Sequence, residues 1–251
     1  MPVFLPSIDQ LILVIFIFTC SQLIYASIGF GSGMFAISLL GLFFGQLEVF
    51  VPLFVLVCFP TELFICIKDR KHFSFKKNYL YILLTIPFII LGSYLLTVIP
   101  SKWPLVFLGF VVFILAIYFL AYENKITWRF KSKSWQVLFG ALSGLMGSLY
   151  GIGGPPLIIY LKGLKLTKRE FRAMCVSVFF AMSIIRLPAF FGMGLLTHDI
   201  IKAWFFILPF SLLGVYIGHS LHKKLSEKRF KRMTSMILLI NGLLLIVKNL
   251  S

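Results

Sequence analysis

The chain has 251 residues, of which 60% are hydrophobic and 13% are charged, and its formal net charge at pH 7 is +16. This composition excludes an ordinary soluble domain, in which about 25% of the residues are charged. Several stretches supply the roughly 20 apolar residues that a helix needs to cross a bilayer. The basic residues lie in short loops between these stretches, which indicates an orientation in a membrane and not a nucleic-acid partner.

The apolar segments follow the same order in both halves of the chain. Each half should begin with a long segment that leads into a glycine-rich stretch and a short helix, and three long segments should follow. The expected segments are 8–25, a short helix ending near 44, 49–67, 78–98 and 105–122, then 135–149, a short helix at 155–162, 173–191, 200–221 and 233–247.

The two glycine-rich stretches, 27–34 and 150–157, are the places where a helix should restart inside the apolar region. Glycine allows backbone conformations that other residues resist, and the prolines at 155 and 156 are tolerated in the first turn of a helix. The helix expected after the first stretch, 34–44, would be about 16 Å long at 1.5 Å per residue, too short to cross a bilayer. The unpaired N–H groups at such helix starts favour an anion.

A shift of 122 residues aligns the two halves without a gap. The register pairs Gly29 with Gly151, Gly31 with Gly153, Gly41 with Gly163, Glu48 with Glu170, Pro87 with Pro209, Phe88 with Phe210, Gly92 with Gly214 and Tyr94 with Tyr216. We interpret the chain as a duplicated unit. Residues 1–122 would form the first membrane repeat, 123–134 a cytoplasmic linker, and 135–251 the second membrane repeat.

The distribution of basic residues predicts that the two repeats are inverted. Most of the 24 Lys and Arg residues lie in four loops, whereas the short loops at 41–48, 99–104 and 192–199 hold only Lys102. Loops at equivalent positions in the two repeats differ in their content of basic residues: where one loop is rich in Lys and Arg, its equivalent has few or none. The positive-inside rule places the basic loops 68–77, 123–134, 162–172 and 221–232 in the cytoplasm and both termini outside. Inverted repeats with broken helices are an architecture of secondary transporters.

Arg186 is the basic residue that lies well inside a long apolar segment, where a charge costs at least ~2.5 kcal/mol. It could be an anion ligand beside the two helix starts. Alternatively, it could extend to the outer surface or form a structural pair.

Glu62 is the acid deep in a long segment, and its counterpart at the repeat register is Ile184, two residues before Arg186. One hypothesis is a Glu62–Arg186 pair that opens when an anion or a proton binds. The alternative is a permanent structural pair.

Other polar residues are also candidates for a functional role. Glu48 and Glu170 occupy matching positions after the short helices and could act in coupling or gating, or could simply be loop or capping acids. Hydroxyl groups that flank the glycine stretches could donate hydrogen bonds to an anion; they belong to Tyr25, Ser27, Ser32, Ser148 and Tyr150.

No catalytic motif, nucleotide-binding context or set of metal ligands is present in the sequence, and no cofactor is expected. The four cysteines lie inside apolar runs without CxxC spacing, which is typical of buried, inert thiols.

At the glycine stretches the chain resembles the TauE/SafE family of sulfite exporters and related membrane permeases, which carries a glycine-rich motif near the start of each half. Gly29-Phe30-Gly31-Ser32-Gly33 looks like the first copy and Gly151-Ile152-Gly153-Gly154-Pro155 like the second. The resemblance covers essentially the whole chain. It implies transport of a small sulfur-containing anion, such as sulfite, sulfoacetate or a related organosulfonate, across the bacterial plasma membrane.

These observations predict an all-α polytopic membrane protein with two inverted repeats, each a broken-helix hairpin plus three transmembrane helices. It would be a secondary transporter that works by alternating access, and not an enzyme. An anion channel, or a membrane-embedded enzyme or binding subunit for a thiol or lipid-linked substrate, are the alternatives. The expected substrate-binding residues are Gly29, Gly31, Ser32, Gly33, Gly151, Gly153, Gly154 and Arg186, with Glu62, Glu48 and Glu170 in coupling or gating.

Overall fold

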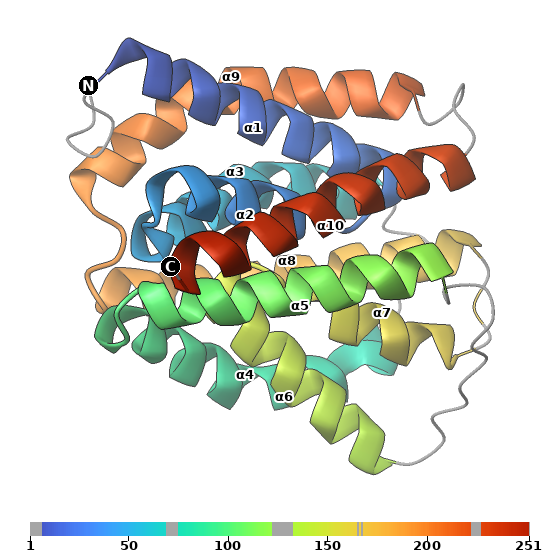
Figure 1. Ribbon diagram of the computed structural model, residues 1–251. Coiled ribbons are helices and arrows are strands. Elements are labelled where there is room, and N and C mark those ends of the chain that lie inside the picture. The colour runs from blue at the N-terminus through green and yellow to red at the C-terminus, as the bar shows by residue number, and fades with distance from the viewer. Residues whose placement is uncertain are drawn as a thin grey trace.

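A computed structural model describes residues 7–68, 75–121, 133–164, 166, 168–221 and 227–250. Within these ranges the chain is helical throughout its regular structure, as the sequence predicts, and Figure 1 shows the helices as a single bundle. The helices are α1 (Ile8–Ile28), α2 (Ser32–Phe44), α3 (Leu47–Lys68), α4 (Phe75–Val98), α5 (Lys102–Ala121), α6 (Lys133–Tyr150), α7 (Gly154–Lys162), α8 (Lys168–Gly192), α9 (His198–Leu221) and α10 (Glu227–Leu250).

Seven helices in the described part of the chain are long and apolar enough to cross a membrane. These candidate spans are Ile8–Ser27, Leu47–Ile67, Tyr79–Val98, Lys102–Ala121, Ala173–Gly192, His198–His219 and Arg232–Leu250. The helices α2 and α7 have 13 and 9 residues, which is too short to span, so the prediction of two short helices after the glycine stretches is confirmed.

Most contacts between helices have a counterpart when each helix is replaced by its equivalent in the other half of the chain. Helix α1 packs on α9, and the equivalent helix α6 packs on α4; α3 contacts its own counterpart α8, and α5 contacts α10. Figure 1 shows these pairs, with α1 and α9 on one side of the bundle, α4 and α6 on the other, and α5 beside α10 across the front. This pattern supports the duplicated unit, whereas the inversion of the repeats and the limits of the domains stay predictions.

Glycines set the closest of these helix contacts. A Cβ at Gly92 in α4 would lie 2.8 Å from the Leu145 carbonyl oxygen of α6. Its repeat mate Gly214 in α9 lies against the Thr19 backbone of α1 in the same way. Small residues that let backbones approach are typical of helix packing in membranes. The matched pair of glycines therefore makes the same kind of helix contact twice, each time between a helix of one half and a helix of the other.

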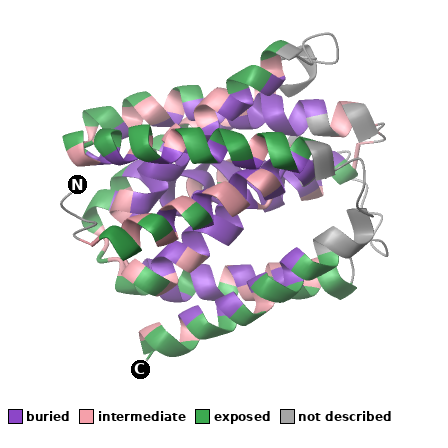
Figure 2. Cartoon of the chain, turned by 90° about the horizontal axis from the view of Figure 1, so that it is seen from above, coloured by how far each residue is buried: buried purple, intermediate pink, exposed green. Residues whose placement is uncertain are grey.

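The burial pattern is that of a bundle surrounded by lipid. Figure 2 shows buried residues in the middle of the bundle and exposed residues on its outer helices. The exposed side chains are largely apolar and aromatic, as at Phe16, Phe107, Phe205 and Tyr216, which are 64%, 54%, 63% and 75% exposed. In water such a surface would be an aggregation hazard, whereas in a bilayer it is the expected lipid-facing surface.

Candidate functional site

The site forms where the two helical hairpins break. Helix α1 ends at Ile28 and Gly29 caps it with φ 90°, after which Gly31, with φ 87°, precedes the first residue of α2. Helix α6 ends at Tyr150, and Gly151 has φ 67°. Gly29 and Gly151, which match in the repeat register, thus share the left-handed conformation that favours glycine.

The two breaks meet each other inside the bundle. A Cβ at Gly33 would collide with the carbonyl oxygen of Gly151, and a Cβ at Gly151 would lie 3.1 Å from Ile37 and 3.2 Å from Phe54. The two glycine stretches can therefore touch only because Gly33 has no side chain, and the absence of a side chain at Gly151 lets its backbone pack closely on Ile37 and Phe54. Backbone that is not helical is tolerated at membrane depth where protein or a cavity covers it, which is the situation here.

The starts of the two short helices differ in the hydrogen-bond donors that they offer. The first three residues of α2 are Ser32, Gly33 and Met34, and no side chain caps their N–H groups. The first three residues of α7 are Gly154, Pro155 and Pro156, and the two prolines have no N–H. The positive end of α2 is thus the richer source of backbone donors for an anion.

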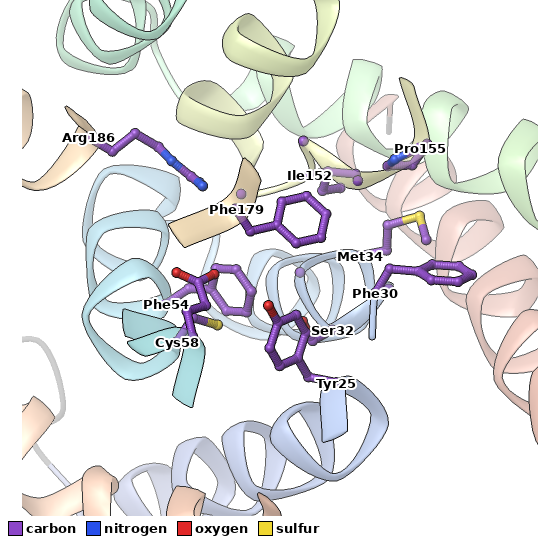
Figure 3. Close-up of a pocket in the computed structure, with 16 residues that line it drawn as sticks. Tyr25, Phe30, Ser32, Met34, Phe54, Cys58, Ile152, Pro155, Phe179 and Arg186 are labelled. Atoms are coloured by element: carbon purple, nitrogen blue, oxygen red, sulfur yellow. The ribbon is translucent and has the colours of Figure 1, made fainter. Parts of the chain in front are cut away.

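A cavity lies between the two breaks. It is lined by Tyr25, Phe30, Gly31, Ser32, Gly33, Met34, Phe54, Cys58, Glu62, Gly151, Ile152, Gly153, Gly154, Pro155, Phe179 and Arg186. Figure 3 shows Tyr25 and Arg186 on opposite sides of this cavity, both with their polar ends directed towards it. The centre of a water molecule can occupy about 40 Å³ of the space, which is room for about three waters at ~10–15 Å³ each.

Arg186 brings a positive charge to the cavity from α8. Its side chain is 4% exposed. The guanidinium donates hydrogen bonds to the carbonyl oxygens of Gly147, at 3.0 Å, and Met182, at 3.4 Å. These bonds fix the group between α6 and α8 without neutralising it. A guanidinium has five N–H donors in a planar fork, a geometry suited to an oxyanion.

Glu62 brings a carboxyl group to the same cavity from α3. Its side chain is 3% exposed, and its Oε2 atom has no hydrogen-bond partner. In the part of the chain that the structure describes, no ion pair joins Glu62 to Arg186. Both residues line the same cavity, which agrees with the hypothesis from the sequence that they approach each other. The structure therefore shows neither a closed ion pair that could open when a ligand binds nor a permanent structural ion pair between Glu62 and Arg186.

Two further polar residues line the cavity. The Tyr25 hydroxyl is buried without a hydrogen-bond partner. The Cys58 thiol accepts a hydrogen bond of 3.1 Å from Gln22 Nε2. Cys58 precedes Glu62 by one helical turn, so the spacing of these two residues could have indicated that they share a face. The apolar members of the lining, such as Phe54 and Phe179, had no distinguishing signal in an apolar sequence.

The remaining residues singled out in the sequence do not line the cavity. Gly29 caps α1 just outside the lining, and Ser27 donates to the carbonyl oxygens of Leu23 and Gly218, at 2.8 and 3.1 Å, which ties α1 to α9. Glu48 accepts a 2.5 Å hydrogen bond from Ser101 Oγ. Glu170 in α8 is not part of the lining, nor are Ser148 and Tyr150, whose ring stacks on Phe107 at 5.9 Å between centroids.

Among the described residues, no group of three or more His, Cys, Asp or Glu side chains could hold a metal ion. The cavity therefore offers one cation, one carboxyl group, neutral polar groups and helix-start donors. This set can bind an anion and exchange a proton.

A family model confirms the resemblance that the glycine stretches suggest. The model for the sulfite exporter TauE/SafE matches residues 13–245, nearly the whole chain. The chain belongs to the sulfite exporter TauE/SafE family. As a family member whose described residues include seven candidate spans, it is a multi-pass membrane protein of a transporter family. No curated protein matches it. No solved structure matches it either.

Proposed function

We propose that the protein is a secondary transporter that moves a small sulfur-containing anion across the bacterial plasma membrane. The observation that carries the proposal is the cavity between the two glycine stretches, where the start of α2 and the Arg186 guanidinium face the same space. Both groups stabilise negative charge, and the surrounding apolar side chains strengthen the interaction by excluding water. Membership of the sulfite exporter TauE/SafE family supplies the substrate class.

The size of the cavity favours sulfite within that class. The volume of about 40 Å³ is room for about three water molecules. A compact anion of roughly four or five heavy atoms, with three oxygen atoms in place of the three waters, is of matching size. Sulfite and thiosulfate fall within this size. Sulfoacetate and larger organosulfonates would require the helices around the cavity to move apart, so we rank them below sulfite.

A difference between the two halves supports alternating access as the mechanism. Helices α5 and α10 both pack on α2, whereas neither has a contact of comparable extent with α7, the repeat mate of α2. Buried Asn241 of α10 also donates a 2.6 Å hydrogen bond to Ser38 of α2. In a duplicated carrier, exchange of such contacts between the two halves would open the cavity first to one side and then to the other.

Purified protein in proteoliposomes should take up radiolabelled sulfite by counterflow, the concentrative entry of label against a preloaded pool of unlabelled sulfite. We expect uptake to saturate with sulfite concentration and thiosulfate to compete better than sulfoacetate, because the cavity is small. Empty liposomes are the control. Uptake that neither saturates nor responds to internal sulfite would favour an anion channel, and no uptake above the control would overturn the proposal.

The proposed orientation places the loops at 99–104 and 192–199 outside and the linker 123–134 in the cytoplasm. In a chain whose native cysteines are replaced by alanine, a membrane-impermeant maleimide added to intact cells should label Lys102→Cys and His198→Cys. It should label Thr127→Cys only after the membrane is permeabilised. The reverse pattern would show that the basic loops lie outside.

A further inference from the structure

We propose that Glu62 is a proton-binding site within the anion cavity, and that the protein carries one proton with each monoanion, such as hydrogensulfite. The inference rests on the proposed function, since it names the coupling ion of the same cavity. It comes from the position of Glu62, which is buried among the lining residues with its Oε2 atom unpartnered.

The surroundings of Glu62 contain a single compensating charge. Of the helices packed against α3, α8 contributes Arg186 and α1 contributes the neutral Tyr25 hydroxyl. Helix α3 itself contributes Cys58, and α2, α6 and α7 contribute no charged side chain to the described lining, nor do α4 and α9. An isolated buried carboxylate is costly and tends to become neutral, unless a cation is near enough to compensate it.

The empty cavity and the cavity that holds an anion and a proton then have the same net charge. In the empty cavity, an ionised Glu62 balances Arg186. A bound monoanion balances the charge of Arg186 in place of Glu62. An ionised Glu62 carboxylate beside the anion would then be repelled by it. A proton taken from water onto a Glu62 carboxyl oxygen, together with the anion, restores neutrality. On the other side of the membrane the anion and the proton leave together.

Charge balance gives the proposal a direct consequence for energetics. A monoanion and a proton carry no net charge, so the transport cycle should be electroneutral. It follows that the membrane potential does not drive the accumulation of hydrogensulfite, whereas a pH gradient does. A carrier without the proton site would move one negative charge per monoanion, and its accumulation would then change about 50-fold for each 100 mV of membrane potential.

The test compares wild type with Glu62→Gln in proteoliposomes whose potential is set with potassium and valinomycin. The probe is radiolabelled sulfite, and the readout is the charge moved per anion, obtained from the dependence of accumulation on potential. We expect a value near zero for wild type. For Glu62→Gln we expect about one elementary charge per anion, with counterflow retained because the amide resembles the protonated carboxyl. Asp9→Asn, which removes an exposed carboxylate from the first turn of α1 outside the cavity, is the matched control and should behave as wild type.

Each result bears on a specific claim. A charge near one per anion in wild type would overturn proton coupling, as would accumulation driven by a sodium gradient at constant pH. A Glu62→Gln protein that remains electroneutral, or that purifies as wild type does yet loses counterflow, would overturn the assignment to Glu62. Absence of counterflow in wild type would instead overturn the proposed function itself, so the two failures are distinguishable.

Discussion

Replacing Arg186 by glutamine should raise the sulfite concentration needed for half-maximal counterflow by about 10- to 150-fold, since a hydrogen bond to a charged group contributes about 1.5–3 kcal/mol. The guanidinium is buried, faces the cavity and is held by carbonyl oxygens, so it is available to an anion. Arg186→Lys should lie between wild type and Arg186→Gln, because an ammonium keeps the charge but not the planar fork. Initial rates of counterflow over a range of sulfite concentrations measure both effects.

Lys202→Gln is the matched control for this prediction. It removes one positive charge from α9, at a side chain that is 64% exposed and paired with Asp199 at 3.8 Å. Such a surface pair contributes little, so sulfite affinity should be unchanged. An Arg186→Gln protein with wild-type affinity would show that the guanidinium is only a structural link between α6 and α8.

Replacing Gly33 by alanine should abolish or strongly reduce sulfite counterflow and lower the thermal stability of the purified protein. The new methyl group would overlap the Gly151 carbonyl oxygen, which belongs to backbone and cannot rotate away. Overpacking of this kind costs about 1–3 kcal/mol, and here it also pushes apart the two glycine stretches that form the cavity. The melting temperature in detergent and the rate of counterflow report the two consequences.

Gly192→Ala provides the control, because a Cβ at Gly192 meets nothing within 4 Å. It should leave both the melting temperature and counterflow as in wild type. If Gly33→Ala were tolerated equally well, the close contact between the two helix breaks would not be needed for binding.

The transmembrane segments and the helix breaks could be predicted from the sequence, because each depends on local properties. The length of an apolar run decides whether a helix can span a bilayer. The left-handed conformation at Gly29 and Gly151 is one that other residues adopt only at a cost, so their positions mark the two breaks. The short helices begin within two residues of the predicted starts for the same reason.

The orientation of each helix about its own axis could not be predicted in this way. In most soluble helices an apolar stripe indicates the buried face, but here lipid and core are both apolar, so the sequence carries little such signal. Cys58 is buried, as expected, but the sequence does not indicate that it faces the cavity. The sequence likewise does not indicate that Tyr150 lies outside the lining, with its ring stacked on Phe107.

The sequence by itself determined the membrane class, the duplicated series of segments and the presence of two polar residues, Arg186 and Glu62, where burial is costly. Only the tertiary structure decided that these residues share one cavity without forming an ion pair, and that Arg186 binds the carbonyl of Gly147 instead. The physical reason is that glycine contacts between distant helices, such as Gly33 against Gly151, set how closely the helices approach and which side chains face inward.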